Sequence, residues 1–323
     1  MKKPMAIVCT GSIAYDYLMS FPGYFRENIL PEHLDKISVS FLVDDMVRQR
    51  GGTAPNIAYT LALLGERPVL MGTVGVDFAD YDAWLRSKNV DTSCVKVIPE
   101  MFTASFFANT DRANAQICSF YAGAMSRASE LSVLELETRP NMVIISPNDP
   151  KAMDRYVREC QENGIPYLYD PGQQVVRSDP SELRHGAEGA HSLFVNEYEF
   201  ELLQKHTGLS RDDILSRVDV LVVTLGERGA DIYANGTKVT VPAIAPKEIL
   251  DPTGVGDAFR GGFVRGEGLD LGWETCGKMG VMAATYCLET RGPQEHSYTP
   301  QEFVARYRQH FDDQGELDVL LRS

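Results

Sequence analysis

The chain has 323 residues, of which 44% are hydrophobic and 24% charged, so it can bury a large core and is not expected to be disordered. Its formal net charge of −14 argues against nucleic acid or an anionic membrane as a partner. The six cysteines form no CxxC pair and no apolar run approaches the length of a membrane span, so neither a disulfide framework nor a zinc site is indicated and a cytoplasmic location is expected.

The first elements of the chain are a short strand and a carboxylate close behind it. Residues 5–9 form an apolar run that ends at a Thr-Gly-Ser turn, which predicts a buried strand. Asp16 follows in a mixed polar and apolar stretch, and on the residues alone it is only an exposed acidic side chain. Residues 37–43 alternate apolar and polar side chains, which predicts a half-exposed strand.

A glycine turn precedes the first long helix. Gly51 and Gly52 come before a helix predicted over 57–65, and a ligand can approach their backbone closely because they carry no side chain. Asn56 offers one acceptor and two donors, which suits a diol. A plain turn at the start of a helix is an equally good interpretation of these residues by themselves.

Several segments with strand propensity indicate a second, smaller sheet. Three of them are at 94–98, 103–110 and 116–121. The last two are joined by a polar turn, so together with 37–43 they predict an antiparallel sheet that forms a small lid. We therefore expect a single domain over 1–323, with lid segments around 13–50 and 94–122 inserted in it.

The remaining strands alternate with helices along the chain. Apolar runs predict strands at 69–75, 142–146, 166–169, 192–195 and 218–224, with helices at 77–88 and 151–163 between them. This alternation predicts an α/β fold with a mostly parallel sheet that is covered on both faces. Ligands of such sheets bind beyond the carboxyl ends of the strands. The residues expected to gather at that edge are Asn196, Glu199, Thr224, Gly226 and Gly229.

The stretch from 250 to 262 carries the most informative chemistry. Gly254 and Gly256 sit where a turn must tighten before a helix, so backbone N–H groups, including that of Val255, point one way and can hold a phosphate group. Asp257 closes the turn and can accept a proton. Phosphoryl transfer to a hydroxyl requires an anion site and a base this close together. The alternative is an Asp that merely caps a helix.

Four motifs resemble those of the ribokinase-like (PfkB-type) carbohydrate and nucleoside kinases, and they follow one another along the chain in the same order as in that family. The run D-P-T-G-V-G-D-A-F at 251–259 resembles the family's second signature, usually D-T-x-G-A-G-D-x-F. The turn at 51–56 resembles its first signature, G-G-x-x-x-N, and 196–199 and 224–229 match N-x-x-E and T-x-G-x-x-G. Pro252 replaces the usual Thr of the second signature, and Val255 its usual Ala.

The resemblance implies a ribokinase-like three-layer α/β/α fold with a small β-sheet lid, and transfer of the ATP γ-phosphoryl group to a hydroxymethyl group. Asp257 is the implied base. The N–H groups of the anion turn, which hold the transferring phosphoryl group, belong to Gly254, Val255 and Gly256. The residues implied to bind the acceptor's hydroxyls are Asp16, Gly51, Gly52 and Asn56.

The nucleotide end of the site also follows from the resemblance. Contacts to ATP are implied for Asn196, Thr224, Gly226, Gly229 and Thr253. Glu199 is implied to act on Mg²⁺ through water, because Mg²⁺ commonly keeps its water shell. The alternative for Glu199 is an exposed helix residue beside an Asn cap. Asp251 is the implied ligand of a monovalent cation such as K⁺, with Pro252 altering that turn.

Aromatic side chains favour a nucleoside over a free sugar as the acceptor, because a purine stacks on flat apolar surface and a sugar does not. Phe41 and Phe120 are the candidates for contacts to the base. The surrounding sequence also resembles the bacterial adenosine-kinase-type members, so adenosine is the expected acceptor. The alternatives are a kinase of ribose or fructose and a nucleoside-binding protein without turnover. A monomer and a homodimer formed through the lid are both open.

Overall fold

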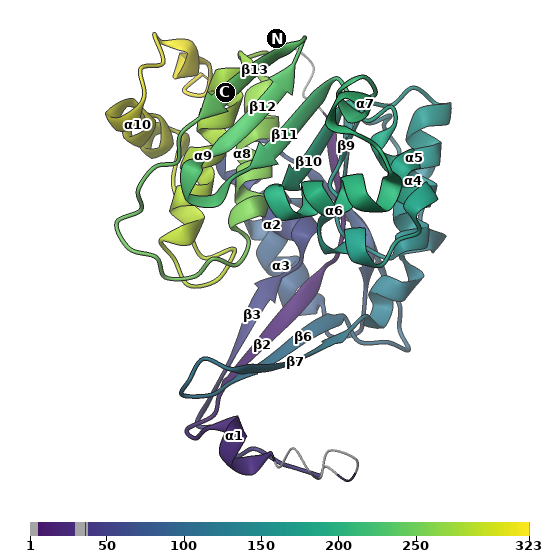
Figure 1. Cartoon of the computed structure of the whole chain (residues 1–323), viewed down its shortest axis with the longest axis vertical. Coiled ribbons are helices and arrows are strands. Elements are labelled where there is room, and N and C mark those ends of the chain that lie inside the picture. Colours follow the sequence, from purple (N-terminus) through teal and green to yellow (C-terminus); the bar gives the residue numbers. More distant parts are fainter. Residues whose placement is uncertain (1–5, 30–35, 37, 323) are drawn as a thin grey trace.

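The computed structural model describes residues 6–29, 36 and 38–322. Its largest element is a nine-stranded sheet with the strand order β13-β12-β11-β10-β9-β8-β1-β4-β5 (Figure 1). The strands are β1 (Ile7–Thr10), β4 (Val69–Val74), β5 (Asp91–Val97), β8 (Met142–Ile145), β9 (Tyr167–Tyr169), β10 (Ser192–Asn196), β11 (Val220–Thr224), β12 (Ala230–Ala234) and β13 (Thr237–Val241). Within this sheet β12 pairs antiparallel with its neighbours, β11 and β13, and the other pairs are parallel.

Helices cover both faces of this sheet. On one side lie α2 (Thr53–Leu63), α3 (Ala79–Ser87), α8 (Val255–Gly268), α9 (Trp273–Leu288) and α10 (Pro300–His310). On the other lie α4 (Pro150–Glu162), α5 (Pro180–Ala187), α6 (Glu197–Thr207) and α7 (Arg211–Leu215). Shorter 3-10 helices are η2 (Gly123–Glu130), η3 (Val133–Glu135), η4 (Gly172–Val176), η5 (Gly226–Arg228) and η6 (Glu316–Val319).

The apolar runs form central strands because both of their faces are buried. In β1, Ile7 and Cys9 pack into the core beneath α2 and α8, while Val8 points into the core beneath α4 and α5. Successive side chains of a strand point to opposite faces, so a continuous apolar run fits a sheet covered on both sides. The predicted three-layer α/β/α fold is confirmed.

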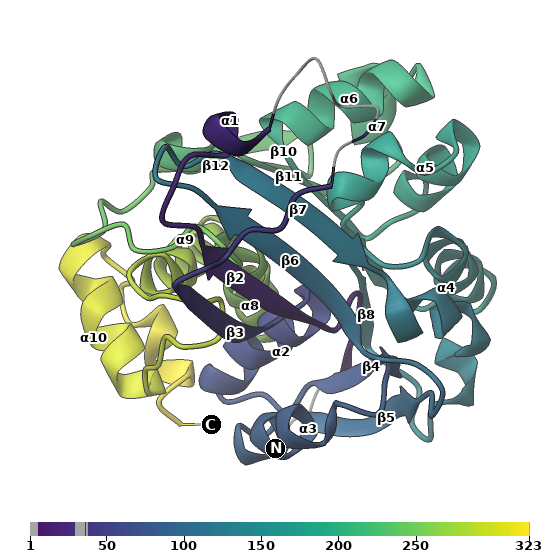
Figure 2. The ribbon, with the colours of Figure 1, turned by 90° about the horizontal axis from the view of Figure 1, so that it is seen from below.

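The second sheet forms the lid, with the strand order β3-β2-β6-β7. Its strands are β2 (Ala14–Ser20), β3 (Asp45–Gly51), β6 (Ala104–Thr110) and β7 (Gln116–Tyr121). The pair β2–β6 is parallel, and β3 and β7 pair antiparallel with their neighbours. The sheet projects from the main body, with the short helix α1 (Phe25–Asn28) beyond its far end, and Figure 2 shows its four strands side by side.

Two of the predicted lid strands are wrong. Residues 38–43 form no strand, and residue 37 lies outside the described residues; the strand is β3, whose polar sequence gives little signal because most of it is exposed. The segment predicted at 94–98 belongs to β5, which pairs in parallel with β4 at the edge of the main sheet. There Cys94 and Val95 pack against opposite cores, which a lid strand would not allow.

In the part of the chain that the structure describes, no helix has the length and apolar character needed to cross a bilayer.

Candidate active site

The predicted anion turn lies at the start of α8. Gly254 is the N-cap residue with φ of 75°, in the left-handed region, and no side chain caps the helix. The first N–H groups of the helix therefore have no side-chain acceptor, and the positive end of the helix dipole lies behind them. This end of α8 can hold a phosphate group.

Both glycines of the turn are required by close neighbours. A Cβ on Gly254 would lie 3.3 Å from Asn56 Nδ2 and would also collide with Pro293. A Cβ on Gly256 would lie 2.7 Å from Arg260 Nη1. The turn is therefore packed between the amide of Asn56, which is predicted to bind the acceptor, and the buried guanidinium group of Arg260.

Asp257 occupies the first turn of α8, beside this anion site. Asn56 Nδ2 donates a hydrogen bond of 2.8 Å to Asp257 Oδ2. Burial raises the pKa of Asp257 to about 6, and Glu199 adds to this, while Arg260 and the hydrogen bond from Asn56 oppose it. A carboxylate with such a pKa is ionised at neutral pH and can still accept a proton from a hydroxyl.

A buried ion pair between Arg260 and Asp170 lies against Gly256 of the anion turn, and the sequence analysis did not predict it. Arg260, 9% exposed, places its Nε 2.7 Å from Asp170 Oδ2, and Asp170 is 1% exposed. Burial raises the pKa of Asp170 to about 7 against the influence of Arg260. Two signals were available, since Arg260 follows Asp257 by three residues on one helix and Asp170 follows a strand end.

On the lid side, a row of paired residues faces the same way. In β2, Asp16 pairs with Gln49 of β3 on one side and Phe106 of β6 on the other, and Phe106 pairs with Phe120 of β7. Residues opposite one another in a sheet project from the same face. The row therefore places one carboxylate beside two aromatic rings, of which the sequence had predicted Phe120 as a base contact.

Asp16 lies close to the predicted glycine turn and to the other carboxylates. A Cβ on Gly51 would lie 2.6 Å from Asp16 Oδ2, so Gly51 makes room for this carboxylate. Burial raises the pKa of Asp16 to about 6, with further contributions from Asp251 and Asp257. Gly52, with φ of 96°, would bring a Cβ to 2.8 Å from Ala14 N, so the β1–β2 connection passes directly over it.

The structure does not bring Phe41 to this row. Its ring packs edge-on against Phe21 and Phe25, at 5.0 and 4.9 Å between ring centres. Phe21 follows the end of β2, five residues beyond Asp16. Since a strand rises about 3.3 Å per residue, this aromatic cluster lies at the far end of the lid.

The predicted nucleotide residues lie together at the carboxyl ends of β10 and β11. Asn196 and Thr224 are paired across the two strands. Asn196 and Glu199 form a reciprocal capping box of two 2.8 Å hydrogen bonds, so Asn196 caps α6. The charge of Glu199 nevertheless reaches the site, because it raises the pKa of both Asp170 and Asp257.

The two glycines after β11 have different surroundings. No atom lies within 4 Å of a Cβ built on Gly226, so its backbone is open to a ligand. A Cβ on Gly229, with φ of 98°, would lie 2.7 Å from Ala243 N, so this glycine serves the packing of the chain.

Asp251 connects the anion turn to a loop after α9. One carboxylate oxygen accepts a 2.9 Å hydrogen bond from Thr253 N, and the other a 3.0 Å hydrogen bond from Gly292 N. This contact gives Asp251 a structural role in addition to the cation contact that the resemblance implies.

The side chains of the site suit a metal ion that is bound mainly by water and by the phosphates of a substrate. Among the described residues, no group of three or more His, Cys, Asp or Glu side chains could hold a metal ion. Mg²⁺ keeps several waters and is commonly bound by one or two carboxylates together with substrate phosphates. Glu199, whose charge acts on Asp257, fits that mode of binding.

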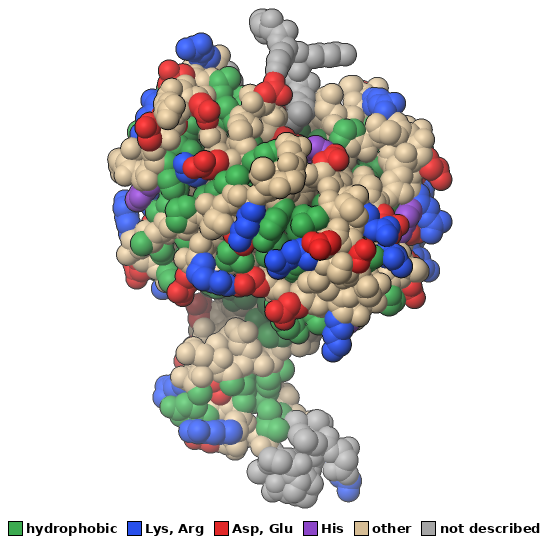
Figure 3. All heavy atoms as spheres, turned by 45° about the horizontal axis from the view of Figure 1, so that its top comes forward, with side chains coloured by type: hydrophobic (Ala, Val, Ile, Leu, Met, Phe, Trp, Pro, Cys, Tyr) green, Lys and Arg blue, Asp and Glu red, His purple; other side chains and the backbone are tan. Residues whose placement is uncertain are grey.

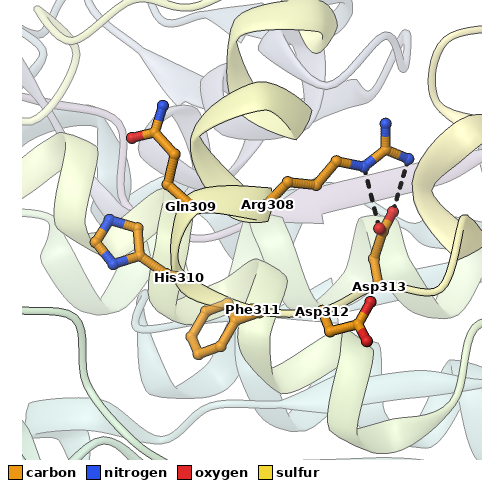
Figure 4. Close-up of a pocket in the computed structure, with 6 residues that line it drawn as sticks. All are labelled: Arg308, Gln309, His310, Phe311, Asp312 and Asp313. Carbon is orange, nitrogen blue, oxygen red and sulfur yellow. Dashed lines mark hydrogen bonds and ion pairs between the residues drawn. The ribbon is translucent and has the colours of Figure 1, made fainter.

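A separate hollow of about 510 Å³ lies at the end of α10, and none of the site residues contributes to it (Figure 4). Its residues are Arg308, Gln309, His310, Phe311, Asp312 and Asp313. The Arg308 guanidinium is already bound by Asp313 and by Asp318. This guanidinium is therefore committed to carboxylates and is not available to a phosphate group.

Known proteins are similar to this chain over nearly its whole length. The profile of the pfkB family carbohydrate kinases matches residues 13–300. The nucleoside kinase of Methanocaldococcus jannaschii is 30% identical over 308 residues, which cover 94% of this chain and 97% of that protein.

Two solved structures of nucleoside kinases have the same fold as this chain. The Burkholderia thailandensis nucleoside kinase in complex with inosine has a TM-score of 0.84 and 36% identity, over 95% of this chain and 98% of that chain. The Methanocaldococcus jannaschii nucleoside kinase, an archaeal member of the ribokinase family, has a TM-score of 0.85 and 29% identity, over 95% and 99% of the two chains.

Proposed function

Because this chain belongs to the pfkB family of carbohydrate kinases and is an ATP-dependent kinase, we propose that it transfers the γ-phosphoryl group of ATP to the 5′-hydroxymethyl group of a nucleoside. The observation that carries the choice of acceptor is the row of Asp16, Phe106 and Phe120 on one face of the lid. Asp16 would hold the ribose hydroxyls and the two rings would cover the base. Adenosine is our first candidate, and the inosine complex of the Burkholderia relative supports a purine.

The chemistry assigned to this chain's residues is a single proton transfer with anion stabilisation. The Asp257 carboxylate takes the proton of the 5′-hydroxyl as its oxygen bonds to the γ-phosphorus and the bond to the ADP oxygen breaks. The N–H groups of Gly254, Val255 and Gly256 hold the charged oxygens of the phosphoryl group in transit. The hydrogen bond from Asn56 and the partial burial of Asp257 support this assignment.

We expect nucleosides to be preferred over free sugars by roughly tenfold to a hundredfold in kcat/KM, because stacking and burial of a base contribute about 1–3 kcal/mol. The measurement is a kinase assay with ATP and a panel of adenosine, inosine, cytidine, ribose and fructose. Faster turnover with either sugar than with every nucleoside would identify a sugar kinase. Nucleoside binding without phosphorylated product from any acceptor would identify a binding protein.

Substitution of one ring separates base contacts from general packing. Phe120→Ala should lower kcat/KM for the nucleoside by about tenfold and leave turnover of free ribose unchanged, because only the base loses a stacking partner. Phe107→Ala is the matched control, since Phe107 stacks on Tyr17 at 4.8 Å on the opposite face of the lid. An equal loss from both substitutions would contradict a base-binding face.

We further propose that Mg²⁺ enters with ATP and is held through water by Glu199, and that Asp251 contributes to a K⁺ site. Mg²⁺, when bound with ATP, would neutralise charge on the phosphates. Glu199 lies close enough to Asp257 for its charge to raise the pKa of that base, which supports a metal position near the anion turn. Replacement of K⁺ by Na⁺ in the assay buffer tests the second site, and unchanged activity would remove it.

Glu199→Gln should weaken the apparent Mg²⁺ affinity by about tenfold or more, since loss of an outer-sphere carboxylate typically has that effect. The glutamine keeps the oxygen that caps α6, so the helix should be retained. Glu197→Gln is the control, because Glu197 lies in the same helical turn and pairs with Arg228 instead. A magnesium titration of Glu199→Gln that overlays that of the wild type would leave Glu199 as a helix cap only.

Two further proposals concern the state of the protein. Between a monomer and a lid-mediated dimer we propose the dimer, because β3 and β7 are the edge strands of the lid and β7 is exposed along its whole length. In the face shown in Figure 3, hydrophobic side chains are visible on the projecting lid. Sedimentation should give the mass of two chains.

We also propose a cytoplasmic location, supported by the need for ATP and by six unpaired cysteines, which cell fractionation would test.

A further inference from the structure

A buried glutamine behind the site binds the acceptor-side amide of Asn56. Gln294 lies in the loop between α9 and α10 and is 1% exposed. Its Nε2 donates hydrogen bonds of 2.6 Å to Asn56 Oδ1 and 2.6 Å to the Tyr81 hydroxyl. The Tyr81 hydroxyl in turn donates to the Gly51 carbonyl at 3.0 Å, so Gln294 Nε2 is held on two sides.

These hydrogen bonds have a fixed direction, and that direction continues to the base. The ionised Asp257 carboxylate can only accept, so the NH₂ group of Asn56 faces it and donates at 2.8 Å, and the Asn56 oxygen faces Gln294, whose Nε2 donates to it at 2.6 Å. An amide without such a partner can turn by 180° and exchange its oxygen and nitrogen. In that orientation the Asn56 oxygen would face the Asp257 carboxylate, and two acceptors would oppose each other.

We infer that Gln294 is a positioning residue, which fixes the amide of Asn56 so that its NH₂ group orients the carboxylate of Asp257 toward the acceptor hydroxyl. Gln294 has no need to touch substrate for this. The inference rests on the proposed role of Asp257 as the base, and it holds for a nucleoside and for a sugar acceptor alike. It assigns a task to a side chain that lies outside all four sequence motifs.

The position of the loop is fixed independently of Gln294. Gly292 N donates to Asp251, and Pro293 packs against the left-handed Gly254 of the anion turn. Three consecutive residues therefore touch the predicted cation residue, the anion turn and the acceptor-side amide. The loop is anchored at two other points, so a change at Gln294 should leave its path intact.

Gln294→Met removes both donors and nearly keeps the volume of the side chain. We expect kcat/KM to fall by about 5- to 30-fold, the equivalent of one lost hydrogen bond beside a charge. We also expect the acidic limb of the pH profile to move to higher pH, because Asn56 would no longer be held in the orientation that favours the ionised carboxylate. The titratable groups that also act on Asp257 or respond to it are Arg260, Glu199, Asp170, Asp16 and Cys287, and this substitution leaves them in place.

Gln294→Glu is the sharper test, because the order of the two variants separates positioning from packing. A carboxylate at position 294 can only accept from Asn56, so Asn56 should turn its NH₂ group to this new carboxylate and its oxygen to Asp257. We expect a larger loss of activity than in Gln294→Met, although Glu matches the shape of Gln better. A role in packing alone predicts the reverse order, and that result would overturn the inference. If Gln294→Met fails to fold, Gln294→Glu and the following cycle carry the test.

A double-mutant cycle with Asn56→Ala shows whether Gln294 acts through Asn56. In the Asn56→Ala background, Gln294→Glu should cause a much smaller loss of kcat than it does when Asn56 is present, because the amide that it orients is gone and only the through-space effect of the new charge on Asp257 remains. Additive losses would overturn the inference. All rates are measured with whichever acceptor the wild type phosphorylates best, so the finding that this acceptor is a free sugar would reject the proposed function and leave the cycle valid.

Discussion

Asp257→Asn is expected to lower kcat by about 10²–10⁴-fold, the usual contribution of a positioned general base. Asparagine keeps the size of the side chain and an oxygen for the hydrogen bond from Asn56, but it cannot take the proton of the acceptor hydroxyl. The loss should appear in kcat, with KM for the acceptor changed little, because the missing interaction forms only in the transition state. Steady-state kinetics with the preferred acceptor measure both quantities.

The wild-type pH profile gives a second measure of the same assignment. Since the pKa of Asp257 is raised to about 6, kcat/KM should be constant at neutral pH and fall as the pH drops through about 6, where the carboxylate takes up a proton. The pKa of Asp16 is also raised to about 6, so both carboxylates contribute to this acidic limb. The control for Asp257→Asn is Asp212→Asn, which removes one negative charge from the exposed face of α7. Turnover of Asp257→Asn at the wild-type rate would remove Asp257 from the mechanism.

Sequence reasoning located the parts of this site that lie within single strand-turn-helix units. The anion turn at 254–257, the glycine turn at 51–56 and the cap at 196–199 each combine a motif with a local change of structure, so a short window contains the whole signal. The parallel order of the apolar strands accounts only for the cap at 196–199, which follows β10 of the main sheet; the glycine turn follows β3 of the lid, and the anion turn follows a loop after β13.

The contacts between these units were not predictable in that way. Asp170 and Arg260 are 90 residues apart, and Asn56 and Gln294 are 238 apart, so no window joins the partners. The lid strands β2 and β3 were missed for a different reason. The strand β2, which carries Asp16, is well buried only at its start, so its sequence lacks the apolar run of a core strand. Its pairing with β6 exists only in the folded chain.

Arg260→Met is expected to lower the free energy of unfolding by about 3–5 kcal/mol, because it leaves the Asp170 carboxylate buried without its cation. Arg260 and Asp170 are 9% and 1% exposed, so water cannot replace the lost partner. Methionine fills much of the space of the arginine stem, and the loss should therefore come from charge more than from a cavity. Denaturant unfolding of the two proteins measures the difference.

The pH dependence of this loss has a definite sign. Burial already raises the pKa of Asp170 to about 7, and removal of Arg260, which lowers it, should raise it further. The folded variant then binds a proton that the unfolded chain releases at lower pH, so its stability falls as the pH rises. The destabilisation of Arg260→Met relative to the wild type should thus be larger at pH 8 than at pH 5. A constant difference over this range would show that lost packing, and not an unpaired charge, is the cause.

A second substitution separates the structural role of Arg260 from its role in the site. In Asp170→Asn/Arg260→Met both charges are gone, so most of the lost stability should return. The activity should not return with it. Arg260 lies directly behind Gly256 of the anion turn and lowers the pKa of Asp257, so without its charge the phosphoryl group is held less strongly and the acidic limb of kcat/KM moves to higher pH. We expect kcat to remain about tenfold or more below that of the wild type, a fraction of the effect of losing one anion-site donor. A double variant with wild-type turnover would reduce Arg260 to the partner of a buried carboxylate.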